Sequence, residues 1–188
     1  MLDRREFVRQ LLIDRGELLV VSGLGSATYD VAAAGDHPLN FYLWGAMGGT
    51  AMVGLGLALA RTDRRIAVLT GDGDMLMGMG SLATIGVKQP SNLAIVVLDN
   101  AHYGETGMQA SHTQSNVDLV ATALACRFKQ ARHVFDLAQA SEVRELLHGG
   151  DGPTLVDARI SSEDVPRVLP LRNGHAIKQR FVAALNTI

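Results

Sequence analysis

Short apolar runs alternate with helical patterns along the chain. Four runs are continuously apolar, rich in β-branched residues and bounded by Gly, Pro, Asn or Asp, which is typical of buried strands. These runs are residues 17–23, 64–71, 92–100 and 153–160. Helical patterns cover residues 3–14, 46–61, 77–88, 117–125, 134–147 and 175–185. The alternation predicts an α/β fold over residues 1–188, a single domain with a doubly wound, mostly parallel sheet covered by helices on both faces.

Composition and charge narrow the class of protein. Apolar residues make up 47% of the chain and charged residues 19%, as in ordinary soluble domains, and the net charge of -2 argues against general affinity for nucleic acid or anionic membrane. The single cysteine, Cys126, excludes an internal disulfide and a Cys-based zinc site. The longest apolar stretch, residues 46–60, is too short to span a bilayer, and the charged N-terminus does not resemble a signal peptide. We therefore expect a cytoplasmic protein without a membrane segment.

Three glycine-rich turns follow predicted strands: "SGLGS" (22–26), "GDGD" (71–74) and "DNAHYG" (99–104). Parallel sheets bind ligands at the carboxyl ends of their strands, so these turns are the candidate site. Asp72 and Asn100 each follow one of two strands expected to be neighbours, and the 27 residues between them fit a crossover connection. One carboxylate, one amide and several backbone N–H groups suit Mg²⁺ carrying a diphosphate.

Each motif alone has a simpler interpretation. "GDG" is a common surface turn, and a methionine such as Met47 in an apolar run is usually core filler. Asp72-x-Asp74 hints at calcium, but the Glu that completes an EF-hand loop is missing. "GLGSAT" lacks the third glycine of a dinucleotide-binding loop. The glycines between 45 and 56 each cost about 1 kcal/mol in a helix, which indicates close approach of another backbone, a partner subunit or a ligand, or equally well tight packing of the helix on the sheet.

In combination, the motifs resemble those of thiamine diphosphate enzymes, whose signature is "GDG", then 26 residues, then an asparagine, here Asn100. Residues 40–60 look like the segment that precedes this signature in the decarboxylase branch. Residues 99–113, "DNAHYGETGMQASHT", look like the segment that follows it in phosphonopyruvate and sulfopyruvate decarboxylases. The resemblance covers about residues 4–160. It implies a thiamine diphosphate-binding fold, in particular the diphosphate-binding half, with thiamine diphosphate and Mg²⁺ as cofactors.

The resemblance also implies roles for individual residues. The metal ligands would be the side chains of Asp72 and Asn100 and the backbone carbonyl of His102. Met47 would lie under the thiazolium ring and hold the cofactor bent, and the Gly45 carbonyl would accept from the aminopyrimidine. Two loops would contact the diphosphate, and two further residues, Tyr103 and Gly104, would shape the pocket. The loop residues are Ser22, Gly23, Gly25 and Ser26 in the first loop and Gly71, Gly73 and Asp74 in the second.

The other half of such an enzyme binds the pyrimidine and supplies an activating Glu, which this chain lacks; Glu105 lies at the wrong end of the cofactor. No catalytic residue is assigned here, and we expect a separate pyrimidine-binding subunit in a hetero-oligomer. The resemblance implies a decarboxylase of a small anionic 2-oxo acid such as sulfopyruvate or phosphonopyruvate, with His112, His102 or Gln109 as candidate substrate contacts. The alternatives are a split acetolactate-synthase-like carboligase and a non-catalytic cofactor-binding subunit. A 2-oxoacid oxidoreductase β subunit would normally carry iron–sulfur cysteines. His133, His148 and His175 have no evident partners and are interpreted as structural.

Overall fold

A six-stranded parallel sheet forms the centre of the molecule. The computed structural model describes residues 1–163 and 165–186. The strand order is β2-β1-β3-β4-β8-β7, and every neighbouring pair is parallel. The strands are β1 (Leu19–Ser22), β2 (Asn40–Tyr42), β3 (Ile66–Gly71), β4 (Leu93–Asp99), β7 (Gln130–Val134) and β8 (Thr154–Arg159); β5 (His102–Tyr103) and β6 (Gln109–Ala110) form a separate antiparallel hairpin.

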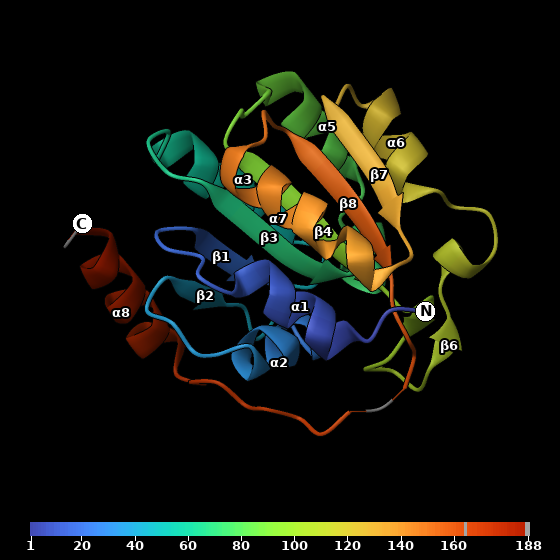
Figure 1. Cartoon of the computed structure of the whole chain (residues 1–188), viewed down its shortest axis with the longest axis horizontal. Helices are drawn as coiled ribbons and strands as arrows, with labels where there is room; N and C mark the ends of the chain where they lie inside the picture. The colour runs from blue at the N-terminus through green and yellow to red at the C-terminus, as the bar shows by residue number, and fades with distance from the viewer. Residues whose placement is uncertain (164, 187–188) are drawn as a thin grey trace.

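Helices cover both faces of this sheet (Figure 1). Buried side chains of α1, α2 and α7 form one hydrophobic core with the sheet, and those of α3, α5 and α6 form the other. Helix α8 lies beside the edge strand β2, where the Phe41 and Phe181 rings meet edge to face at 5.4 Å. The helices are α1 (Arg4–Leu12), α2 (Ser26–Ala33), α3 (Thr50–Ala60), α4 (Asp72–Met77), α5 (Gly80–Lys88), α6 (Leu119–Ala125), α7 (Ala140–Gly149) and α8 (Gly174–Asn186), with short 3-10 turns at His112–Gln114 and Leu137–Gln139.

The predicted α/β class and all four predicted strands are confirmed. The central strands β3 and β4 are buried on both faces, which is why they appear in the sequence as continuous apolar runs. Their register pairs Gly71 with Leu98. Asp72, directly after the end of β3, and Asn100, directly after the end of β4, therefore lie at the same edge of the sheet.

Several predicted boundaries were wrong. The segment 134–147 is not one helix: β7 ends at Val134, and α7 begins only at Ala140. Strand β7 was missed because it is an edge strand whose sequence, "QARHV", is polar and mostly half-exposed. The strand β2 and the helix α2 were also missed.

The helix predicted over 46–61 begins at Thr50, because Ala46 and Gly48 have positive φ values of 58° and 87°. The helix predicted over 77–88 begins only at Gly80, as α5, and a separate helix α4, Asp72–Met77, precedes it. The break lies at Gly78, where an added Cβ would come within 2.1 Å of the Gly48 carbonyl oxygen. The 46–49 turn therefore lies against α4, with Gly48 close to both Asp74 and Gly78.

Helix α3 is apolar on most of its surface but is only 11 residues long. Within residues 1–163 and 165–186, no helix has the length and apolar character needed to cross a bilayer. Gly54 in α3 accounts for one of the glycines noted in the sequence, because a Cβ there would lie 2.2 Å from Val68 Cγ2 on β3. The glycine thus permits close packing of this helix on the sheet.

Candidate active site

A cavity at the carboxyl edge of the sheet brings together most of the predicted site residues. It lies between the ends of β3 and β4, the start of α2 and the β5–β6 hairpin. Four predicted residues, Ser22, Gly23, Gly25 and Gly45, are absent from its lining. The predicted residues that do line it are Ser26, Met47, Gly71, Asp72, Gly73, Asp74, Asn100, His102, Tyr103 and Gly104.

Asp72 is a buried carboxylate in the wall of this cavity. It is 2% exposed, and its Oδ2 accepts a hydrogen bond of 2.5 Å from the Ser111 hydroxyl. Burial raises the pKa of Asp72 to about 6, and the charge of Asp99 adds to the rise, whereas Ser111 and the backbone N–H groups of Asp72 and Gly73 oppose it. An ionised carboxylate in this position is poorly compensated by the protein alone, so it favours a bound cation.

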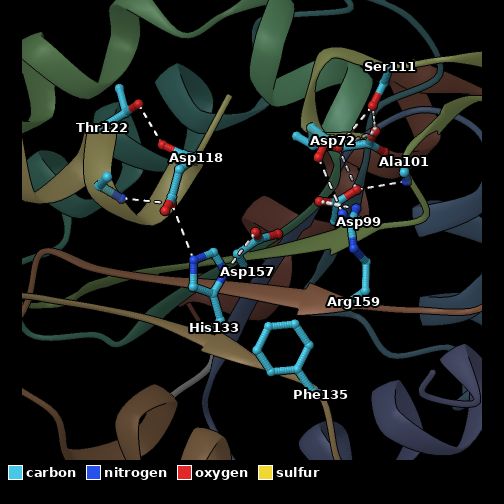
Figure 2. Close-up of polar contacts among 12 residues, drawn as sticks. Asp72, Asp99, Ala101, Ser111, Asp118, Thr122, His133, Phe135, Asp157 and Arg159 are labelled. Atoms are coloured by element: carbon cyan, nitrogen blue, oxygen red, sulfur yellow. Dashed lines mark hydrogen bonds and ion pairs between the residues drawn. The ribbon is translucent and has the colours of Figure 1, made fainter. Parts of the chain in front are cut away.

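A second buried carboxylate, Asp99, lies next to Asp72 (Figure 2). Its Oδ2 forms an ion pair of 2.8 Å with Arg159. Its Oδ1 accepts from the Ala101 N–H at 2.7 Å and from the Thr113 hydroxyl at 2.8 Å. Thr113 in turn bonds to Ser111 at 2.9 Å, which links the two carboxylates through hydroxyl groups. Asp99 therefore stabilises the segments around the site and does not itself line the cavity.

The turn 99–102 holds Asn100 and His102 beside the cavity. Ala101 adopts a positive φ of 61°, an unusual conformation for a residue other than glycine, and is held there by its bond to Asp99. The Asn100 Oδ1 accepts from the His102 N–H at 3.0 Å, and the His102 ring contacts the Asn100 carbonyl oxygen at 2.8 Å through Nδ1. The His102 ring thus folds back on the turn.

Asp74 fixes the turn that carries Met47. Its carboxylate accepts from the Gly48 N–H and from the Thr70 hydroxyl, and the residue is 6% exposed. Met47 itself is 41% exposed. A Cβ added to Gly73 would lie 2.9 Å from the Tyr103 ring and 3.3 Å from Met47 Cε. Met47, Gly73 and Tyr103 therefore meet at one side of the cavity.

The 22–26 loop contributes less than predicted to the cavity wall. The Ser22 hydroxyl is fully buried and bonds to the Thr28 hydroxyl at 2.7 Å, and Thr28 also donates to the Gly23 carbonyl at 2.7 Å. A Cβ added to Gly23 would meet Thr70, Asp74 and Thr50 within 3.1 Å. Ser22 and Gly23 thus pack the loop inward, and Ser26 with its neighbours Leu24 and Ala27 faces the cavity.

The candidate substrate contacts are engaged with each other or with their own hairpin. The His112 ring contacts the Tyr103 hydroxyl at 2.7 Å through Nδ1, and the two rings meet edge to face. The Gln109 amide bonds to the hydroxyl and the carbonyl of Thr106, both at 3.0 Å. His112 adjoins the Met47 side of the site, where it lines a neighbouring, largely apolar hollow.

Sequence reasoning missed several residues of the site. Arg4 and Arg159 come from segments without a motif, and Ser111 and Thr113, although they lie in the 99–113 segment, were given no role; all four reach the site only through the fold. His133, expected to lack partners, has two: its ring nitrogens lie 3.3 Å from Asp118 and 3.2 Å from Asp157 (Figure 2). Burial, and next the charge of Asp99, raise the pKa of Asp157 to about 7.

The donors around Asp72 differ from a cluster of acidic or histidine ligands. In the described part of the chain, no three His, Cys, Asp or Glu side chains are grouped in a way that could hold a metal ion. The combination present is one carboxylate, one amide and backbone groups at the mouth of a cavity, which suits Mg²⁺ only when an oxygen-rich ligand supplies the rest of its coordination. The residues therefore fit a Mg²⁺–diphosphate pair.

Comparisons with known proteins agree with this geometry. The family model of the thiamine pyrophosphate enzyme, C-terminal TPP binding domain, matches residues 23–158. The sulfopyruvate decarboxylase β subunit of Methanothermobacter thermautotrophicus is 35% identical over 184 residues, which is 97% of this chain and 95% of that subunit. The phosphonopyruvate decarboxylase of Streptomyces viridochromogenes is 38% identical over 173 residues, but this chain spans only 42% of its length.

Solved structures support the same fold. Benzoylformate decarboxylase from Polynucleobacter necessarius superposes with a TM-score of 0.73 at 18% identity, over 86% of this chain and 34% of that one. A 2-oxoglutarate:ferredoxin oxidoreductase from Magnetococcus marinus superposes with a TM-score of 0.70 at 17% identity, over 94% of this chain and 72% of that one. At these identities the likeness establishes the fold alone.

Proposed function

Because this chain belongs to the thiamine pyrophosphate enzymes, within their C-terminal TPP-binding domain family, we propose that it is the diphosphate-binding subunit of a two-subunit 2-oxo acid decarboxylase. All of residues 1–188 would form that one domain. The observation that carries the proposal is the convergence of Asp72, Asn100 and the glycine-flanked start of α4 on one cavity at the carboxyl edge of the sheet.

The cofactor site follows from this geometry. Asp72 and Asn100 would be side-chain ligands of Mg²⁺, with the His102 backbone carbonyl as a third protein ligand. The buried, poorly compensated charge of Asp72 supports this assignment. The N–H groups of Gly73 and Asp74 and the 22–26 loop would hold the diphosphate. Met47, beside Gly73 and Tyr103, would support the thiazolium ring, and Gly45 would accept from the pyrimidine.

When bound, thiamine diphosphate would supply the electron sink that allows a 2-oxo acid to lose CO₂. The residues of this chain would hold the metal and the diphosphate end of the cofactor, and they would form the apolar wall of the cavity. None of them is assigned a proton-transfer role. The activating Glu would come from a separate pyrimidine-binding subunit, so the active enzyme would be a hetero-oligomer. The proposal includes a cytoplasmic location, where a lone thiol such as Cys126 stays reduced.

The substrate would be a small anionic 2-oxo acid, with sulfopyruvate as the first candidate. The match to sulfopyruvate decarboxylase β subunits along almost their whole length supports this choice, as the Methanococcus maripaludis subunit also aligns over 98% of both chains at 34% identity. His112, beside Tyr103 on the Met47 side, is positioned better than Gln109 to meet an anionic tail.

The direct test is CO₂ release from sulfopyruvate, phosphonopyruvate and pyruvate with Mg²⁺ and thiamine diphosphate. The chain would be assayed alone and together with its co-purified partner subunit. We expect turnover only in the complex, with an anionic substrate preferred over pyruvate. Formation of acetolactate without net preference for an anionic substrate would favour a carboligase. Bound cofactor with no turnover of any 2-oxo acid would contradict the decarboxylase assignment.

A further inference from the structure

One permanent cation lies in the wall of the cavity, and it comes from a part of the chain that carries no motif. Among the described residues that line the cavity, Arg4 is the sole Lys or Arg. We propose that Arg4 binds the diphosphate directly. We also propose that the carboxylate of Glu105 competes with the diphosphate for the same place in the cavity. This inference rests on the proposed function and deepens it, because it assigns two residues of the cavity wall to the cofactor's diphosphate end.

Arg4 is held rigidly before any ligand binds. It is the first residue of α1 and is 6% exposed. Its Nε and Nη2 lie 2.8 Å and 2.6 Å from the same oxygen of Asp30, which is fully buried on α2. In the described part of the chain its Nη1 has no hydrogen-bond partner. A guanidinium oriented in this way loses little entropy when it binds an anion.

Asp30 does not neutralise the positive charge completely. Its other oxygen accepts from Arg5 Nε at 2.7 Å, so two guanidinium groups share one carboxylate. Arg5 leaves this cluster in another direction, since its Nη2 donates to the Pro166 carbonyl at 2.5 Å, and Arg5 does not line the cavity. The surplus charge is therefore presented to the cavity by Arg4.

The cavity needs such a cation. Its other charged lining residues are the three carboxylates of Asp72, Asp74 and Glu105. A diphosphate carries more negative charge than one Mg²⁺ neutralises, particularly when Asp72 already offsets part of the metal's charge. The planar fork of an Arg side chain is well matched to phosphate oxygens. Arg4 next to Ser26 and Ala27 is placed to meet the end of the diphosphate that the 22–26 loop faces.

Glu105 lies in the wall of the same cavity, against the 22–26 loop. It lies in the connection between β5 and β6, and its Oε1 would be 2.5 Å from a Cβ added to Gly25. Gly25 has a φ of 72°, and the carboxylate packs directly on it. In the described residues Glu105 has no hydrogen bond or ion pair, and it is exposed. Glu105 and Arg4 line both the cavity and its neighbour on the Arg5 side. A diphosphate that contacts the loop must therefore displace or face this carboxylate.

The test is a calorimetric titration of the full chain with Mg²⁺-pyrophosphate, and of its complex with Mg²⁺-thiamine diphosphate and with unphosphorylated thiamine. The variants are Arg4→Gln, Arg4→Lys, Arg5→Gln and Glu105→Gln. Arg5→Gln is the matched control, because it also removes a partner of Asp30 but lies outside the cavity. Arg4→Lys keeps the ion pair with Asp30 if Arg4→Gln fails to fold.

We expect Arg4→Gln to weaken pyrophosphate binding by about tenfold or more and Arg4→Lys by about threefold, as for loss of one charge-assisted contact. Arg5→Gln should change it by less than about twofold, and Glu105→Gln should tighten it by about threefold through loss of a like charge. Binding of unphosphorylated thiamine should not change in any variant.

Two results would overturn the role of Arg4: wild-type affinity for pyrophosphate in Arg4→Gln or Arg4→Lys, or an equal loss in Arg5→Gln. Unchanged affinity in Glu105→Gln would overturn the role of Glu105. In each of these cases the wild-type protein still binds Mg²⁺-pyrophosphate, so the proposed function stands. If the wild-type chain and complex bind neither ligand, the proposed function itself fails, and this inference fails with it.

Discussion

The Ser111 hydroxyl donates a hydrogen bond of 2.5 Å to Oδ2 of Asp72, although 39 positions separate the two residues. Ser111 is 2% exposed and is itself tied to the turn after β4, because its N–H donates to the Ala101 carbonyl at 2.8 Å. The hairpin that follows Asn100 thus returns to hold the carboxylate at the end of β3. The two halves of the proposed metal site are joined by this contact before a metal binds.

Replacing Ser111 with Ala should weaken the metal site without unfolding it. Loss of the hydroxyl removes a donor that favours the ionised form of Asp72, so the pKa of Asp72 should rise further above 6. We expect Mg²⁺-dependent binding of thiamine diphosphate to weaken by about threefold to tenfold at pH 6.5 and by less at pH 8. Calorimetry at the two pH values measures this. Equal losses at both would show that Ser111 acts by other means.

Binding of the metal should depend on pH through Asp72 itself. Mg²⁺ requires the ionised carboxylate, and the pKa of Asp72 is raised to about 6, mainly by burial. The affinity of the chain for Mn²⁺ in the presence of a saturating diphosphate, measured by electron paramagnetic resonance relative to that of Asp72→Asn, should be constant above pH 7 and fall about tenfold per unit well below pH 6. Asp72→Asn should show no such step. A midpoint near pH 4 in the wild-type chain would contradict the burial of this charge.

Asp72→Asn should stabilise the metal-free chain at pH 8. Between the ordinary pKa of 3.8 and the raised value of about 6, the folded chain keeps a proton that the unfolded chain releases. The contribution of Asp72 to the free energy of unfolding therefore falls as pH rises through this window. Above the window, the full cost of burying the ionised carboxylate lowers stability. We expect the free energy of unfolding of the variant to exceed that of the wild type by on the order of 2 kcal/mol at pH 8, and by little at pH 4. Urea unfolding at the two pH values decides it, and a variant that is less stable at pH 8 would refute it.

Two glycines of α3 should respond oppositely to the same substitution. In Gly54→Ala the new methyl would lie 2.2 Å from Val68 Cγ2, which should lower the free energy of unfolding by about 2 kcal/mol. Gly56 is exposed with nothing within 4 Å of an added Cβ, so Gly56→Ala should raise it by up to about 1 kcal/mol. Urea unfolding of the two variants measures both effects. Equal destabilisation in the two variants would show that the close contact with Val68 is not the reason why Gly54 is a glycine.

The strands that could be predicted from the sequence are those buried on both faces of the sheet. Strands β3 and β4 are covered on both faces, so their sequences are continuously apolar and their carboxyl ends could be located. Strand β7 lies at the edge and has a polar sequence, and such a sequence is equally typical of loops and exposed helices. The start of α3 depends on the positive φ values of Ala46 and Gly48, which follow from contacts with Asp74 and Gly78 that no local pattern records.

The site divides in a similar way. Asp72, Asn100 and the glycines beside them could be found because they follow strands directly. Arg4 and Ser111 could not, because each acts through one long-range contact, to Asp30 and to Asp72. Ser22 shows what a motif leaves open: its position in a glycine-rich loop suggested a ligand contact, and the structure shows only that its hydroxyl is buried against Thr28.

The central claim is that this chain holds a diphosphate through a metal bound by Asp72. It is tested most directly by calorimetry of Mg²⁺-thiamine diphosphate with the complex of this chain and its partner subunit, for the wild type and for Asp72→Ala. We predict binding in the wild type that is lost when EDTA removes the metal, and a loss of at least about a hundredfold in Asp72→Ala with an unchanged circular dichroism spectrum. Equal affinity in the wild type and in Asp72→Ala, or binding indifferent to EDTA, would contradict the claim.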